Sequence, residues 1–370
     1  MRNRTLFVVA LTLALALVGA LPVLAAVDMD AALDYLGTQQ NADGGFGSGF
    51  SPDSTVSSTA DALHAIIAAG GDPAGFAPGG ATTLAYLADH AAAVDNAGDL
   101  SKLILALVAA GENPRTFGGV DSVQRLEGMV DDSGKIGTAN DTFFSHVMAV
   151  LALASVQRQL PDGAVALLED AQQENGAWAW DGTDATAADT NTTAFAVQAL
   201  IAAGEPASGE AVSAALDYYA SIQNVDGGWP YQNPSQFGTD TDANSTAVTI
   251  QALIAAGEDP AGAAWTTDEG GTPVAMLESL QNASGAFGWQ VAVPSDNLLA
   301  TVQALPALAG QVFPMATMSV GEPAPQAAAA PGAAPETVPE TGAAVMNPGL
   351  LLALGGLALA AGGALLHRRR

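Results

Sequence analysis

The sequence predicts an all-α fold, an α/α toroid in which six helical hairpins form an inner and an outer ring. Three observations predict this fold: a short turn signature recurs, an alanine-rich apolar segment follows each clear copy, and the spacing of apolar residues is helical. The signature reads Gln-x3-Gly-x-aromatic and is clearest at 223–229, which leads into the apolar segment 242–257. No long alternating run of β-branched residues occurs, so we expect no sheet.

The two helices of each hairpin differ in polarity, and this difference predicts the two rings. In the fifth hairpin the first helix keeps a polar face, whereas the second is apolar nearly all round. A helix without a polar stripe is buried on every side, so we expect the second helices to form the inner ring. Glycine and proline mark helix ends, and Pro306 should end or kink the last helix. The expected hairpins are 30–40 with 57–69, 81–94 with 100–110, 120–130 with 141–156, 164–173 with 189–203, 210–223 with 242–256, and 274–281 with 296–305.

The turn signature is expected to have a structural role. Its glycine can take a left-handed conformation after an outer helix, and its Gln amide can bond backbone groups of the turn. Its aromatic ring can pack across the seam to the adjacent hairpin. The second hairpin has lost the signature, and the third keeps Gly134 but has Val130 at the Gln position. The full copies are Gln40, Gly44 and Phe46; Gln172, Gly176 and Trp178; Gln223, Gly227 and Trp229; and Gln281, Gly285 and Phe287.

Both ends of the chain are predicted to lie outside the toroid, which we place at 27–316. Residues 1–26 have the basic start, apolar run and small-residue end of a secretory signal peptide, the alternative being a retained membrane anchor. Residues 317–347 are rich in Pro and Ala and predict a disordered stalk. The apolar run 348–367 and the basic tail 368–370 predict a transmembrane helix with a cytoplasmic end.

A motif in the stalk resembles the sortase sorting signal of bacterial wall-anchored proteins. Residues 338–342 read Val-Pro-Glu-Thr-Gly, with Val338 where that family has Leu. The resemblance implies cleavage between Thr341 and Gly342 and attachment to the cell wall. Without cleavage the helix would stay in the membrane. Both outcomes place the toroid outside a bacterial cell, anchored at its surface.

Charge and composition exclude several classes of partner. Between the end segments stand five basic residues and all 38 acidic ones, a formal charge of 5 − 38 = −33. This charge disfavours nucleic acid, anionic lipid and polyphosphate. The chain has no Cys, so disulfides and thiolate metal sites are excluded. The five basic residues are Lys102, Arg115, Arg125, Lys135 and Arg158, which we do not expect to cluster.

Small polar residues begin two inner helices at matching positions. Because the starts of inner helices would surround one mouth of a central cavity, these side chains are candidate ligand-binding residues. The alternative is that they only cap the helices, since Asp, Asn and Thr accept bonds from the first free N–H groups. Three aromatic residues nearby are candidate stacking surfaces for a flat or apolar ligand. The candidate set is Asp189, Asn191, Thr193, Asp240, Asp242, Asn244, Thr246, Trp180, Tyr231 and Trp289.

The signature before an Ala-rich inner helix resembles the repeats of the squalene and terpenoid cyclases and of protein prenyltransferase β subunits, and more loosely those of transcobalamin-like binders. The resemblance covers about 27–314 and implies the toroid fold. Class II cyclases protonate an alkene with an Asp-x-Asp-Asp motif, so a cyclase activity would use Asp240 and Asp242, with Ala243 in place of the last acid. Prenyltransferases hold zinc with an Asp, a Cys and a His, and here the Cys is missing.

No metal or other cofactor is expected. The lone histidines are His64, His90 and His146, and His64 stands where other inner helices have Gln198 and Gln251. The start of an EF-hand loop is matched at 240–244, but the required Gly and Glu are absent. A looser carboxylate site for Ca²⁺ outside the cell is the remaining alternative.

The leading hypothesis is a non-catalytic, surface-anchored toroid that binds an extracellular ligand at its cavity mouth. The ligand could be a small molecule, a corrinoid, a glycan or a protein. The first alternative is a terpenoid cyclase-like or prenyltransferase-like enzyme with a deep apolar cavity. The second is a structural surface protein whose cavity is filled by side chains.

Overall fold

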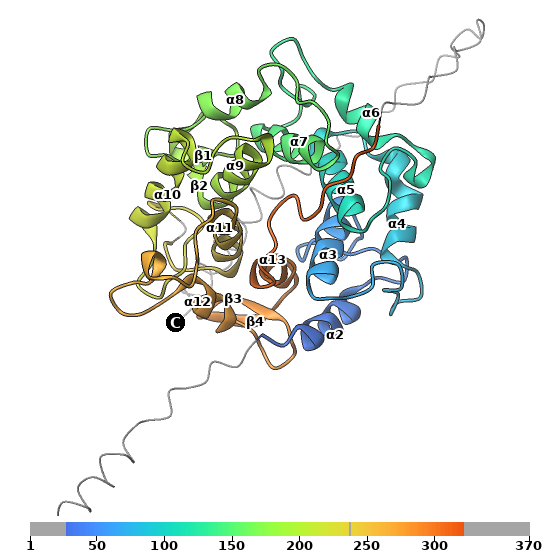
Figure 1. Ribbon diagram of the computed structural model, residues 1–370. Coiled ribbons are helices and arrows are strands. Elements are labelled where there is room, and N and C mark those ends of the chain that lie inside the picture. Colours follow the sequence, from blue (N-terminus) through green and yellow to red (C-terminus); the bar gives the residue numbers. More distant parts are fainter. Residues whose placement is uncertain (1–26, 237, 322–370) are drawn as a thin grey trace, which may run out of the picture.

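The computed structural model describes residues 27–236 and 238–321, and over these ranges it contains twelve α-helices in six hairpins. Figure 1 shows the hairpins arranged as an inner ring of helices within an outer ring. The outer helices are α2 (Met29–Gln39), α4 (Thr83–His90), α6 (Ser122–Glu127), α8 (Ala164–Asp170), α10 (Glu210–Ile222) and α12 (Pro273–Glu278). The inner helices are α3 (Val56–Ala68), α5 (Ala97–Ala109), α7 (Phe143–Ser155), α9 (Thr190–Ala203), α11 (Ala243–Ala255) and α13 (Leu298–Leu308).

The ring is closed on itself. Each inner helix contacts the next one along the chain, and α13 contacts α3. On the outside, the Gln281 side chain exchanges two hydrogen bonds of 2.9 Å with the backbone N–H and carbonyl of Asp28. The sixth hairpin therefore meets the first, as the repeat pattern predicts.

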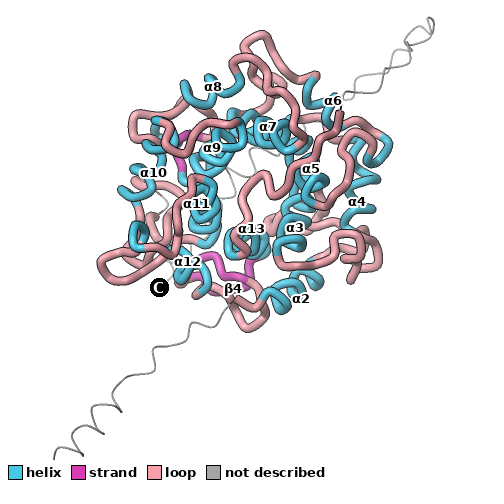
Figure 2. Tube along the Cα trace, in the orientation of Figure 1, coloured by secondary structure: helices cyan, strands magenta, loops and turns pink. Residues whose placement is uncertain are grey.

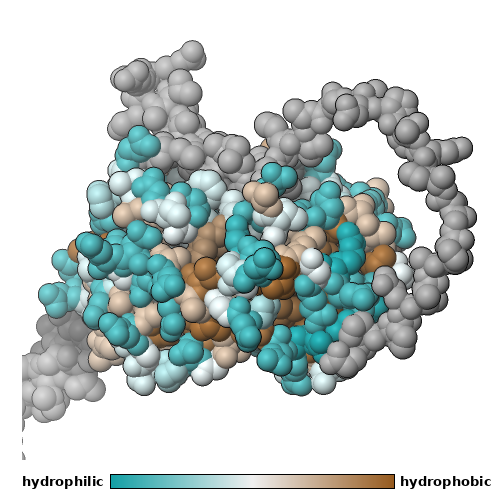
Figure 3. Space-filling model, turned by 90° about the horizontal axis from the view of Figure 1, so that it is seen from above, coloured by the Kyte–Doolittle hydropathy of each residue, from teal (hydrophilic) through white to brown (hydrophobic). Residues whose placement is uncertain are grey.

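Burial follows the polarity of the two kinds of helix. In α7 ten of 13 residues are buried, whereas in α2 three of 11 are. Burying a Val or Leu side chain fully stabilises the folded state by about 1.5–3 kcal/mol relative to leaving it exposed. The apolar helices therefore contribute most to stability when they lie in the inner ring. The polar faces of the outer helices remain at the surface, and the view in Figure 3 shows a mainly hydrophilic exterior with hydrophobic residues gathered in its middle.

The turn signature joins each hairpin to its neighbour. In all four full copies the Gln amide donates a hydrogen bond of 2.9–3.1 Å to the carbonyl of the signature glycine. The same nitrogen of Gln223 also donates across the seam, to the Trp265 carbonyl at 3.0 Å. Gly176 has a φ of +86°, and a Cβ there would lie 2.2 Å from the Ala214 carbonyl oxygen of the next outer helix. Glycine is thus required both for its conformation and for the close approach of the two hairpins.

The signature aromatics are fully buried, and the predicted packing across the seam is confirmed for Trp229. The indole N–H groups of Trp178 and Trp229 donate to the Leu168 and Tyr219 carbonyls, at 2.6 and 2.9 Å, in the outer helix of their own hairpin. A buried indole N–H needs a partner, and the end of the preceding helix supplies it. Contact across the seam is made by the ring face, since the Trp229 and Trp265 ring centroids are 5.9 Å apart.

The prediction that no sheet forms is wrong. Two small antiparallel sheets occur, β1 (Trp178–Ala179) with β2 (Ala188–Asp189) and β3 (Phe287–Gln290) with β4 (Val293–Asn297), also visible in Figure 2. They form because the extended signature aromatic pairs with the residues that lead into the inner helix. Pro306 does not end α13, which continues to Leu308. Proline removes one hydrogen bond, but this position lies in the last turn, and Gly310 with a φ of +68° follows the helix.

In the part of the chain that the structure describes, no helix is long and apolar enough to cross a membrane. The predicted signal peptide 1–26, the sorting motif with Thr341 and Gly342, the predicted span 348–367 and the tail 368–370 lie outside the described residues. Of the predicted stalk, residues 317–321 are described, and they lie on the ring rather than apart from it. The ring's own core accounts for this, since Met318 and Val320 pack against it.

Candidate functional site

The six inner helices can be aligned by their first residues. Each has an N-cap side chain that accepts a hydrogen bond from the backbone N–H three residues later, which satisfies one free donor of the first turn. Residues at equal distances from the cap therefore lie at similar depths in the ring. The caps are Thr55, Asn96, Thr142, Asp189, Asp242 and Asn297.

Four residues after the cap, a threonine holds the signature turn. Thr193 and Thr246 accept hydrogen bonds of 2.9 and 3.0 Å from the backbone N–H of Trp178 and Trp229, and Thr59 and Thr301 do the same in their hairpins. Two members of the candidate ligand set thus have a structural partner. This contact recurs in every hairpin that has the full signature, a repetition that the sequence displays.

His146 replaces this threonine in the third hairpin. Its Nδ1 accepts from the Ile136 N–H at 3.0 Å, so its Nε2 is the protonated nitrogen that donates to the Ala164 carbonyl at 3.0 Å. Burial lowers the pKa of His146 and keeps the ring neutral. His146 is therefore a structural residue in a hairpin that has lost the usual threonine.

The two acids of the predicted mouth are buried helix caps. The Asp189 and Asp242 carboxylates each accept from a backbone N–H and a hydroxyl of the first turn, at 2.7–2.9 Å. Burial raises the pKa of Asp189 to about 7 and that of Asp242 to about 6. Asp240 is exposed in the preceding loop, so the two acids of the Asp-x-Asp motif differ in burial. These contacts are those of the capping alternative.

Asn191 and Asn244, two other members of the candidate set, lie in the first turn of α9 and α11. Side chains in this region link one inner helix to the next. The Asn244 amide donates to Gln303 Oε1 of α13 at 2.6 Å. Asn191 holds the equivalent position of α9, and its buried Oδ1 has no hydrogen-bond partner in the described structure. The remaining links are an ion pair of 2.7 Å between Lys102 and Asp61 and a contact of 5.4 Å between the rings of Phe144 and Phe195.

Deeper in the ring, nine residues after the cap, three polar side chains meet the C-terminal segment 309–321, which we call the strap. Gln198 Oε1 accepts from the Phe313 N–H at 2.7 Å, and Gln251 Nε2 donates to the Gln311 carbonyl at 3.0 Å. The third side chain is His64, whose ring centroid lies 4.9 Å from that of Phe313. The equivalence of these three positions is visible in the sequence, but their common partner is not.

Phe313 fills the centre of the ring. Its ring centroid is also 5.8 Å from that of Phe195 on α9, and in the closed ring α9 lies opposite α3, which carries His64. Burial lowers the pKa of His64 to about 4, so the imidazole is neutral at physiological pH. Neither of its ring nitrogens makes a hydrogen bond of good geometry among the described residues, although backbone groups of Ala60 and Leu105 lie near enough to oppose part of the lowering of its pKa.

Exposure differs among the side chains of the interior. Phe144, Asn191 and Phe195, near the helix N-termini, are half-buried, whereas Asn244 in the same region is buried. At the level of the strap, His64, Gln198 and Gln251 are at most 2% exposed. We take this interior as the candidate site.

Two surface pockets lie elsewhere, both between the third and fourth hairpins. One, of about 490 Å³, is lined by residues that include Lys135, Asp141, Asp170 and Asp181. The other, of about 660 Å³, lies near the ends of α7 and α9. No residue of the candidate set lines either pocket, and no pattern in the sequence joins residues across this seam. Trp180, Tyr231 and Trp289 are half-buried and each stands two residues after a signature aromatic.

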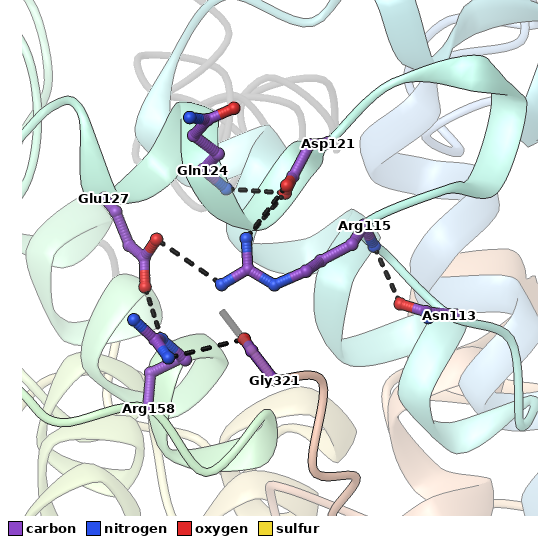
Figure 4. Close-up of polar contacts among 7 residues, drawn as sticks. All are labelled: Asn113, Arg115, Asp121, Gln124, Glu127, Arg158 and Gly321. Carbon is purple, nitrogen blue, oxygen red and sulfur yellow. Dashed lines mark hydrogen bonds and ion pairs between the residues drawn. The ribbon is translucent and has the colours of Figure 1, made fainter. Parts of the chain in front are cut away.

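The expectation that the basic residues stay apart is wrong for two of them. Arg115 and Arg158 both contact the Glu127 carboxylate, at 3.6 and 2.6 Å, as Figure 4 shows. Arg115 also pairs with Asp121 at 2.9 Å. The fold brings these residues together from different loops, with acids between them, so they do not form an open diphosphate site. Among the described residues, no group of three or more His, Asp or Glu side chains is arranged to hold a metal ion.

Comparisons with known proteins agree with the fold. The family model of the squalene-hopene cyclase C-terminal domain matches residues 126–292, and that of the prenyltransferase alpha-alpha toroid domain matches residues 2–91. A search of curated proteins gives no match.

Solved structures give the same result. The apo type II terpene cyclase MstE from Scytonema has a TM-score of 0.54 at 14% identity, covering 76% of this chain and 96% of that one. A variant of MstE in complex with its substrate geranylgeranyl dihydroxybenzoate gives 0.54 at 13% identity, covering 76% and 95%. Candida albicans protein geranylgeranyltransferase-I complexed with GGPP gives 0.51 at 11% identity, covering 79% and 95%.

Proposed function

Because the chain belongs to the terpenoid cyclase and prenyltransferase α/α-toroid superfamily, we propose that its ring interior binds an apolar ligand of the isoprenoid class without transforming it. The observation that carries the proposal is a pair of half-buried aromatic rings, Phe144 and Phe195, whose centroids lie 5.4 Å apart on neighbouring inner helices. Two structural neighbours of the same fold bind geranylgeranyl dihydroxybenzoate and GGPP.

The positions of the acids favour binding over cyclisation. Cyclisation by protonation needs a carboxylic acid that faces the ligand. Asp242 is engaged by the first turn of α11, and Asp61 is held by the Lys102 ammonium at 2.7 Å. The aromatic faces that would stabilise a cation are present, but neither of these two carboxyl groups stands free to deliver the proton.

The closed end of the interior bears on the kind of ligand. Phe313 stands between opposite inner helices, and we expect it to close a ligand site at this end. Such a site favours a slender apolar chain over a corrinoid or a glycan. Together with the predicted signal peptide and anchor, the proposal is of a protein that holds an extracellular lipid-like molecule at the bacterial surface.

The test uses the 27–321 fragment and the alcohol geranylgeraniol as a probe. Native mass spectrometry is expected to show one bound molecule per chain, and Phe195→Ala should weaken binding at least tenfold. Phe117→Ala, which removes the same ring from the outer side of the toroid, serves as the matched control. An absence of binding by the native fragment, or equal binding by the Phe195 variant, would contradict the proposal.

A terpenoid cyclase is the second candidate, and the family and structural comparisons favour it. It predicts that a geranylgeranyl substrate is converted to a cyclised product of unchanged mass with a new chromatographic retention time. If such a product forms and is lost in Asp242→Asn or Asp61→Asn, the non-catalytic proposal fails. A purely structural role would give neither product nor bound ligand.

A further inference from the structure

The strap crosses the face of the ring where the inner helices end. It leaves α13 at Gly310, and Figure 1 shows it running across the ring toward α6. On the way the Met318 N–H donates to the Ser155 carbonyl at the end of α7, at 2.8 Å. A single segment of chain thus contacts α3, α7, α9 and α11.

The inner half of the strap is held by side chains that bind its backbone. Gln198 accepts from the Phe313 N–H, and Gln251 donates to the Gln311 carbonyl. The Phe313 ring lies against His64. These contacts form a polar level nine residues after the helix caps. Without the strap, Gln198 Oε1 and Gln251 Nε2 would lose these hydrogen-bond partners.

The outer half of the strap is held by a chain of ion pairs. Arg158 Nη1 donates to the Gly321 carbonyl at 3.4 Å, and Glu127 fixes Arg158 and connects it to Arg115, as in Figure 4. Between these contacts Thr317 and Ser319 are exposed. The strap is therefore held at separate points and not by a continuous ladder of backbone bonds, which makes it easier to open than the helices.

Building on the proposed function, we propose that the level of His64, Gln198 and Gln251 is the polar end of the ligand site and that the strap is its exchangeable cover. With the strap docked, Phe313 and its backbone fill this level. With the strap released, the three side chains bind an uncharged head group, such as an alcohol or a carbonyl, at the end of an apolar chain. A charged head group is disfavoured because the neutral imidazole and the two amides offer no countercharge at this buried level.

The test compares the binding of two probes, geranylgeraniol and the hydrocarbon squalene, to the 27–321 fragment. The alcohol is expected to bind at least tenfold more tightly, and only the alcohol should increase hydrogen exchange at the Phe313 and Met318 amides. His64→Leu should remove the preference, whereas His64→Gln, which restores the side chain found at the two equivalent positions, should keep it. Circular dichroism verifies that both variants are folded.

A strap variant gives an independent measurement. Phe313→Ala should tighten geranylgeraniol binding at least threefold, because the cover competes less well, while Phe117→Ala should leave it unchanged. Equal binding of both probes, with no change in strap exchange, would overturn the inference and leave the proposed function standing. If neither probe binds to the native chain or to the Phe313 variant, both proposals fail.

Discussion

The two faces of the ring are built in different ways. On the face with the signature turns, the same local contacts recur in each full copy. A Gln amide donates to the glycine carbonyl, the glycine packs against the next outer helix, and a threonine hydroxyl accepts from the backbone N–H of the aromatic residue. On the opposite face, one segment that has no counterpart in the repeats contacts four inner helices. The repeated contacts join each hairpin to its neighbour, whereas the unrepeated strap joins inner helices that are not neighbours.

The largest expected effect tests the repeated face at the seam where the ring closes. A Cβ on Gly285 would lie 2.1 Å from the Ala31 carbonyl oxygen, whereas one on Gly204 would meet nothing within 4 Å, although both have a positive φ. Gly204→Ala should lower the free energy of unfolding by about 1 kcal/mol through backbone strain alone. Gly285→Ala should lower it by more than about 3 kcal/mol, because it also forces two backbones apart.

Urea denaturation measures both variants on the same fragment. An equal decrease in the free energy of unfolding for Gly285→Ala and Gly204→Ala would mean that the seam between the sixth and first hairpins can accommodate an added methyl group. The ring would then owe its shape to the inner helices and not to the signature turns.

The next effect tests the strap face through its buried histidine. The pKa of His64 is lowered to about 4 in the folded chain, against an ordinary value near 6.5. The folded state therefore has its full stability above pH 6.5 and loses about 3 kcal/mol as the pH falls toward 4, where the unfolded chain binds the proton. His64→Gln should remove this loss.

The comparison must be made as a difference between native chain and variant. Asp189 and Asp242 have raised pKa values and act in the opposite sense, since their contribution to stability is lost as the pH rises from about 4 to 7. Both chains carry these acids, so the difference in unfolding free energy between pH 7 and pH 4.5 isolates His64. An identical pH profile for the two chains would show that His64 is not buried beside Phe313.

The repeated face could be predicted from the sequence, and the strap could not. Gln, Gly and aromatic residues at fixed spacing indicate a turn, and the polarity of 210–223 and 242–256 indicates outer and inner helices, because repetition makes the same local physics visible several times. The sequence also aligns His64 with Gln198 and Gln251. What joins these three is the strap, through Gln311 and Phe313, and no periodic pattern marks a segment that occurs once after the last repeat.

The candidate mouth residues show the same division. Four of them recur at matching positions of two inner helices, namely Asp189 and Asp242, and Thr193 and Thr246. In the structure the two acids are helix caps and the two threonines bind the signature turns. The interior contacts of Asn244 with Gln303 and of Lys102 with Asp61 join different hairpins through residues of different types. Such contacts depend on how the ring closes, which a single hairpin cannot reveal.

A smaller effect is expected where the outer half of the strap is held. Glu127→Gln removes the charge that pairs with Arg158 and with the buried Arg115, and we expect a loss of about 1–2 kcal/mol, reduced by the partial exposure of the carboxylate. Hydrogen exchange at the Met318 amide should rise in parallel. Glu174→Gln, at an exposed position with no described partner, should change stability by less than about 0.5 kcal/mol. Unchanged exchange at Met318 would separate the ion pairs from the docking of the strap.

The smallest effect distinguishes the two acids of the Asp-x-Asp motif. Asp242 caps α11 by accepting from the Ser245 N–H and hydroxyl, at 2.8 and 2.9 Å, whereas Asp240 is exposed. Asp242→Ala should therefore lower the free energy of unfolding by about 1 kcal/mol, and Asp240→Ala by less than about 0.5 kcal/mol. A cyclase that used both acids would lose turnover in both variants whatever their stability. Thermal unfolding of the pair, measured beside product formation from a geranylgeranyl substrate, thus decides whether this motif serves the repeated face alone.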